Sequence, residues 1–228
     1  MNEGLRPKIV EKASLNAHLT PGVKPIMACL FSLEDSSDKF SSTERASIYE
    51  RFNPELDDVE NVIYDNENRY VISPVNEKRK FVGELNDCTS LIVTGIDKKT
   101  GNNVSFLTHM DPKKFLYEKR DAFLADLKQR LSEIKERCLP GTIDAVIVGG
   151  KYLPVVVNNK RIETKQNYLD SIKLVSDETQ KVLTFKPPII NGPKMTDGSD
   201  NICFDTTNRQ LYFMRPKVNR GIRSFTSF

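Results

Sequence analysis

The stretch that decides the fold runs from Cys88 to Asp111, CTSLIVTGIDKKTGNNVSFLTHMD. Two apolar runs, at 91–93 and 104–107, flank a polar segment in which Gly101 suits a positive φ. This pattern predicts two antiparallel strands joined by a turn centred near residues 99 and 100. Paired residue numbers then sum to about 199, which places His109 opposite residue 90 and diagonal to Cys88.

This register can bring a thiol and an imidazole together on one face. Diagonal Cβ atoms lie about 7–8 Å apart, and sheet twist or a bulge can shorten that gap. A slip of one residue would instead put Cys88 and His109 on opposite faces. A thiol within hydrogen-bond reach of an imidazole forms a thiolate nucleophile with its own acid and base. Taken alone, the pattern favours a structural explanation, in which the cysteine is a small buried hydrophobe and the histidine a satisfied polar residue.

Downstream of the hairpin, the sequence predicts a long helix and a buried strand. Asp111 and Pro112 are typical of a helix start, and Pro140-Gly141 ends the helix. Apolar residues recur between them at helical spacing: Phe115, Phe123, Leu127, Leu131, Ile134 and Cys138. The apolar run 145–148, which ends in Gly149-Gly150, predicts a buried central strand.

Shorter elements complete the expected fold. A second helix is predicted over 164–174, a strand at 189–190, and a final hairpin from 201–204 and 210–214. Upstream, 62–64 and 70–72 predict a hairpin around a polar turn, and 23–31 predicts a buried strand. Strands surrounding two helices favour an α+β fold with a layered, β-sandwich-like core.

Length and composition limit the class of protein to which the chain can belong. The chain has 228 residues, 38% of them hydrophobic and 29% charged, with a net charge of +3, which is typical of a soluble globular protein and too balanced to predict nucleic-acid binding. No stretch approaches the ~18 apolar residues that span a bilayer. We expect an N-terminal extension of unassigned role at 1–60, a domain at 61–215, and a basic mobile tail at 216–228.

Cysteine and histidine usage predicts neither a metal site nor a disulfide framework. The chain has four cysteines, no C-x-x-C pair and two histidines. Cys29, Cys138 and Cys203 lie in apolar patterns and are expected in the core. Reduced thiols favour a cytoplasmic setting.

The ordered set of elements resembles a known superfamily of Cys-His protein deamidases. Residues 70–111 resemble the protein N-terminal asparagine amidohydrolases, with a strand running into Ser73-Pro74, a polar loop, Cys88 beside Thr89, and then Leu107-Thr108-His109. The order of a Cys strand, a His strand, a long helix, the Gly149-Gly150 strand, a helix and a final hairpin is similar to the chemoreceptor glutamine deamidases. The cytotoxic deamidase toxins share this core arrangement. The resemblance covers roughly residues 61–215.

The resemblance implies a thiol-dependent amidohydrolase that needs no metal or cofactor. Cys88 would be the nucleophile and His109 the base, acting through a thioester on a glutamine side chain of a protein substrate. N-terminal asparagine is the alternative amide, and a non-catalytic binding module and a thiol protease or acyl transferase are the alternative classes. The composition is compatible with a bacterial effector delivered into a host cell. No nucleic-acid or membrane partner is expected, and the oligomeric state is left open.

One departure from the family concerns the residue that orients the histidine. The chemoreceptor deamidases place a threonine six residues before the cysteine, where this sequence has Val82. The orienting role then falls to Ser73, to a backbone carbonyl, or to nothing. For the oxyanion, the candidates are the backbone N–H of Cys88 and the side chains of Thr89 and Asn86.

Overall fold

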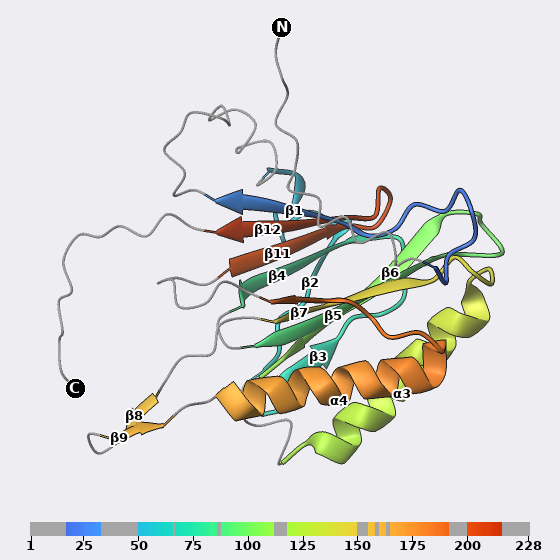
Figure 1. The fold of residues 1–228 in the computed structure, drawn as a ribbon. Coiled ribbons are helices and arrows are strands. Elements are labelled where there is room, and N and C mark those ends of the chain that lie inside the picture. Colours follow the sequence, from blue (N-terminus) through green and yellow to red (C-terminus); the bar gives the residue numbers. More distant parts are fainter. Residues whose placement is uncertain are drawn as a thin grey trace, which may run out of the picture.

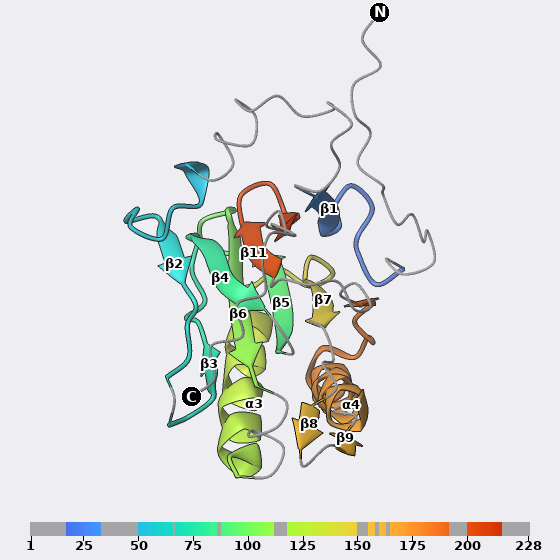
Figure 2. The same cartoon turned by 90° about the vertical axis from the view of Figure 1, so that its left-hand side faces the viewer.

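The computed structural model describes residues 17–32, 50–65, 67–85, 88–111, 118–149, 155–157, 160–162, 165–191 and 200–215. Two five-stranded mixed sheets and two helices form three stacked layers, with both helices on the outer face of one sheet (Figures 1 and 2). The predicted α+β class with a layered core and two helices is confirmed.

The first sheet has the order β1-β12-β11-β4-β2. Its strands are β1 (Met27–Ser32), β2 (Val59–Asn61), β4 (Arg79–Leu85), β11 (Asp200–Asp205) and β12 (Gln210–Arg215). The predicted final hairpin is the antiparallel β11–β12 pair. The predicted strand at 23–31 is a strand only from residue 27 on, as β1, which pairs in parallel with β12. Part of the expected N-terminal extension is therefore an edge strand of this sheet.

The second sheet has the order β10-β7-β5-β6-β3. Its strands are β3 (Tyr70–Ile72), β5 (Thr89–Ile96), β6 (Asn103–Met110), β7 (Asp144–Gly149) and β10 (Ile189–Asn191). The predicted hairpin is β5–β6, and Gly101 in its turn has a φ of 73°. Every residue of β7 is buried, as predicted for a central strand. A separate small ribbon joins β8 (Val155–Val157) to β9 (Lys160–Ile162).

The two helices cover this second sheet. Helix α3 (Arg120–Arg137) buries the predicted stripe of Phe123, Leu127, Leu131 and Ile134, with Cys138 buried at its C-cap. The predicted helix start at Pro112 is wrong, because α3 begins at Arg120, after the non-helical residues Glu118 and Lys119. Phe115 lies outside the described residues. Helix α4 (Lys165–Leu183) is longer than predicted, because Val175, Thr179 and Leu183 continue its buried stripe.

One sequence prediction about strand pairing is wrong. Residues 62–64 and 70–72 do not form a hairpin: β2, which ends just before this segment, pairs with β4 in the first sheet, whereas β3 pairs with β6 in the second. The polar turn joins strands of different sheets, although the sequence on either side of it matches the pattern of a hairpin. The chain at 62–69 therefore crosses from sheet to sheet, next to His109 on β6.

The core has two main parts, one on each face of the second sheet. Alternate residues of β5 and β6, such as Leu91 and Phe106, pack against the helices, while Ile92 and Leu107 pack between the sheets. This alternation determines which face of the sheet each candidate functional residue occupies.

Candidate active site

The predicted hairpin register is confirmed and places the candidate pair on one face. Thr89 pairs with Met110 and Ile92 with Leu107, so paired residue numbers sum to 199. Cys88 packs with Ile92 and Leu107 in the core between the sheets. His109 lies on the same face as Leu107 because side chains two residues apart point the same way. Cys88 and His109 thus share the inter-sheet face, at the end of the hairpin away from its turn.

A backbone carbonyl orients the His109 ring. Nδ1 lies 3.2 Å from the carbonyl oxygen of Val62, which can only accept, so Nδ1 carries the proton. In the neutral ring, Nε2 then has a free lone pair. Nε2 is buried and has no hydrogen-bond partner among the described residues. Of the three orienting options in the sequence, the backbone carbonyl is the one realised.

Burial keeps this imidazole neutral. The His109 side chain is 5% exposed, and burial lowers the pKa of the imidazole from 6.5 to about 4, against a smaller opposing effect of the Val62 hydrogen bond. The ring is therefore unprotonated at neutral pH, with the lone pair of Nε2 open to a hydrogen-bond donor. A buried nitrogen without a partner is rare in folded proteins and calls for a functional or structural reason.

The Cys88 thiol meets a tyrosine hydroxyl. Cys88 is 3% exposed, and its Sγ is hydrogen bonded to Oη of Tyr64 at 3.3 Å. The Tyr64 ring packs against the His109 ring, with 4.5 Å between centroids and a tilt of 59°. Tyr64 thus touches both members of the candidate pair. Nε2 of His109 makes no hydrogen bond to the thiol in this structure.

An arginine and an aspartate lie next to the side chains of Tyr64, Cys88 and His109. Arg69 approaches the Tyr64 ring, with 6.0 Å from Cζ to the centroid, and its Nε lies 3.6 Å from Asp111 Oδ2. The Asp111 backbone N–H donates to the Arg69 carbonyl oxygen at 2.9 Å. These contacts connect the 62–69 segment to the end of β6.

The other predicted site residues do not join Cys88 and His109 through their side chains. Ser73 Oγ accepts the backbone N–H of Leu107 at 2.9 Å, so it supports β6 rather than the His109 ring. Thr89 is the neighbour of Cys88 and faces the helices, where its hydroxyl is hydrogen bonded to that of Ser171 at 3.0 Å. Asn86 lies outside the described residues.

Sequence reasoning missed Val62 and Tyr64. The sequence pattern places both in a hairpin that the structure does not contain. The signal that could have found Tyr64 is its place in an apolar run followed by a polar turn, which also fits a crossing between sheets. The local sequence does not distinguish the two arrangements.

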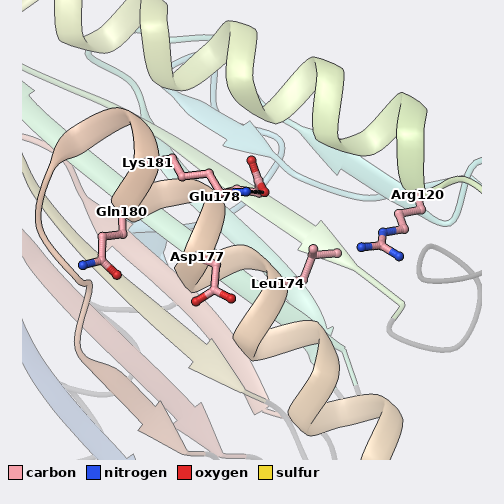
Figure 3. Close-up of a pocket in the computed structure, with 6 residues that line it drawn as sticks. All are labelled: Arg120, Leu174, Asp177, Glu178, Gln180 and Lys181. Carbon is pink, nitrogen blue, oxygen red and sulfur yellow. Dashed lines mark hydrogen bonds and ion pairs between the residues drawn. The ribbon is translucent and has the colours of Figure 1, made fainter.

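A cavity of about 450 Å³ lies elsewhere, against α4 and the start of α3 (Figure 3). It is lined by Arg120, Leu174, Asp177, Glu178, Gln180 and Lys181. Lys181 pairs with Glu178 at 2.5 Å, and Asp177 pairs with Lys173. The helices lie on the face of the second sheet opposite to Cys88 and His109, so this cavity shares no residue with the candidate site.

Comparison of the sequence with protein-family models and with curated proteins finds no match. Within the described part of the chain, no group of three or more His, Cys, Asp or Glu side chains is arranged to hold a metal ion. The described helices include none that is long and apolar enough to cross a membrane.

Proposed function

We propose that the protein is a thiol-dependent amidohydrolase that converts a glutamine side chain of a protein substrate into glutamate. The observation that carries the proposal is the unpaired Nε2 of His109, held ready as a proton acceptor on the sheet face that also holds the Cys88 thiol. Nucleophilic cysteines are activated by such a base when a third group orients it. Here the third group is the Val62 carbonyl.

The chemistry follows from these groups. Nε2 of His109 takes the proton of Cys88, and the thiolate adds to the carboxamide carbon. The carbon–nitrogen bond then breaks as His109 returns the proton, which releases ammonia and leaves a thioester. Water adds to the thioester while His109 accepts its proton, and the carbon–sulfur bond breaks to give the carboxylate and the free thiol.

Two features of the free protein must change when substrate binds. The thiol is hydrogen bonded to Tyr64, and Nε2 of His109 makes no hydrogen bond to it. Catalytic hydrogen bonds are often long or misaligned before substrate binds and tighten in the complex. The carboxamide would enter beside Tyr64, which is only partly buried and borders the solvent.

The glutamine preference rests on the resemblance and on one contact. An N-terminal asparagine substrate has a free α-amine that needs an acidic group. Asp111 is the described acidic residue nearest His109 in the chain, and it already interacts with Arg69. An internal glutamine needs no such group, which favours it over the alternative amide.

The first test compares thiol reactivity within the same chain. Alkylation by iodoacetamide is measured from pH 5 to 10, with each cysteine followed by peptide mass analysis. Burial raises the pKa of Cys138 to about 11 and raises that of Cys203 further, so these two thiols are internal controls. We expect Cys88 to react first, with an apparent pKa below ~8.5, and His109→Gln to slow it at pH 7.

The second test follows the reaction itself. Candidate protein substrates are incubated with the protein and examined for ammonia release and for glutamine converted to glutamate, with Cys88→Ala as the control. Backbone cleavage would instead identify a protease. If Cys88 reacts no faster than Cys138 and its alanine variant only loses stability, the thiol is structural and the protein is a binding module.

A further inference from the structure

Tyr64 is held at the Cys88 thiol by a segment fixed at both ends. The Val62 N–H donates to the Phe81 carbonyl oxygen at 2.8 Å, which fixes one end on the first sheet. The Asp111 N–H donates to the Arg69 carbonyl oxygen, which fixes the other end on the second sheet. The hydroxyl therefore reaches Sγ from a defined direction, at 3.3 Å.

The geometry points to Tyr64 as the oxyanion donor of the reaction at Cys88, a role that rests on the proposed function. When the thiolate adds to a carbonyl carbon, the oxyanion forms on that same carbon, two bonds from Sγ. A hydroxyl already in contact with Sγ can reach that oxygen, because donors act at about 2.7–3.1 Å from the oxyanion. The ring of Tyr64 rests on His109, so the same residue aligns base and donor.

The environment of Tyr64 suits a donor. Burial, and next the hydrogen bond to Cys88, raise the pKa of the phenol well above its ordinary 10. The hydroxyl therefore stays protonated over the working range of the thiol. The side chain of Thr89 is excluded from this role because it lies on the helix face of the sheet.

This role also narrows the class of substrate. A phenol donor stabilises an oxygen anion that forms on an sp² carbonyl carbon, as in a carboxamide or an ester. It gives no such help to displacement at an sp³ carbon, where no oxyanion develops. The ratio of the acylation rate to the alkylation rate at Cys88 should therefore depend on Tyr64.

Two reagents separate these chemistries without knowledge of the natural substrate. Iodoacetamide reacts at an sp³ carbon: the carbon–sulfur bond forms and iodide leaves. p-Nitrophenyl acetate reacts at its carbonyl: the thiolate adds, an oxyanion forms, and p-nitrophenolate leaves as the acetyl thioester appears. Both rates are measured at Cys88 on the full chain by peptide mass analysis and corrected with a Cys88→Ala sample.

The variant is Tyr64→Phe, which keeps the ring on His109 and removes only the hydroxyl. We expect acylation to fall about 10²-fold relative to alkylation, the loss typical of one oxyanion donor. Tyr70→Phe is the matched control, because its hydroxyl bonds to Asp126 on α3 and its ring packs on Phe123. It should leave the ratio of the two rates unchanged.

Three other outcomes would contradict the assignment of Tyr64 as the oxyanion donor. A parallel fall in both rates would mean that Tyr64 acts only on the thiolate. A parallel rise would mean that Tyr64 only covers the thiol. If Cys88 in the unmodified chain reacts with neither reagent, the proposed function fails and the donor role fails with it. An alkylation rate retained in Tyr64→Phe also shows that the variant is folded around Cys88.

Discussion

Two buried polar clusters lie at opposite ends of the same inter-sheet core, and they differ in how completely their hydrogen bonds are formed. At the turn end of β6, Lys80 on β4 donates to Asn76 Oδ1 at 2.5 Å and to the Pro74 carbonyl oxygen at 3.3 Å. At the other end, His109 keeps one nitrogen bonded and leaves Nε2 without a partner among the described residues.

The cluster at the turn end has the properties of a structural one. Glu60 lies 3.8 Å from the Lys80 amine, and the buried hydroxyls of Ser105 and Thr206 are hydrogen bonded to each other at 2.7 Å. None of these atoms lacks a partner in the part of the chain described. An unsatisfied buried group costs about 1–3 kcal/mol, so the polar groups at the two ends of the core differ in what they cost the fold.

The largest expected effect on stability concerns His109 and acid. The folded imidazole has a pKa of about 4, whereas the unfolded chain titrates near 6.5, so only the unfolded state binds a proton between these values. The free energy of unfolding should therefore fall by roughly 3 kcal/mol between pH 7 and pH 4 from this residue alone. Urea unfolding at several pH values measures this loss, and His109→Gln should remove it.

The other histidine supplies the control for that experiment. His18→Gln removes the only other imidazole, which stacks on Phe185, and keeps the His109 contribution. If both variants lose stability in acid as the unmodified chain does, His109 is not buried in its neutral form, and the contrast between the two clusters disappears.

A somewhat smaller effect is expected at alkaline pH from the satisfied cluster. Burial lowers the pKa of Lys80 from 10.5 to about 8, so the unfolded state holds a proton that the folded state gives up above pH 8. Lys80 alone should add roughly 2 kcal/mol to the free energy of unfolding between pH 7.5 and 9.5. The buried thiols of Cys138 and Cys203, whose pKa is raised, act in the opposite direction over the same range, so the Lys80 contribution is read as the difference between two pH profiles. Lys80→Met should remove this contribution from the pH profile, and the exposed neighbour Lys78 changed to Met should keep it.

The upper limit of pH 9.5 keeps the tyrosines out of this measurement. Burial raises the pKa of Tyr64 and Tyr70 in the folded chain, so the unfolded state would begin to lose phenol protons first, near pH 10. A Lys80→Met variant that also loses Cys88 reactivity would show that the two clusters are coupled and not separate.

The sequence predicts most of the secondary structure around the site, but it does not predict that Val62 and Tyr64 belong to the site. Turn chemistry around Gly101 and period-two patterning were enough to place Cys88 and His109 on one face, because a hairpin's register follows from its turn. The apolar stripe of α3 follows from helical spacing alone. Val62 and Tyr64 could not be placed this way, because their positions depend on a crossing between sheets, which no local period encodes.

The smallest expected effect tests the opposite face of the same strand. Thr89→Val keeps the shape of the side chain and removes the hydroxyl bonded to Ser171, so it should lower the free energy of unfolding by about 1 kcal/mol. The rate of Cys88 alkylation should stay within about twofold of the unmodified chain, because side chains of adjacent strand residues point to opposite faces. Urea unfolding and the alkylation assay measure the two effects on one sample. A loss of reactivity as large as that of His109→Gln would mean that the sheet transmits changes on its helix face to the thiol, and that burial between the sheets does not isolate the site.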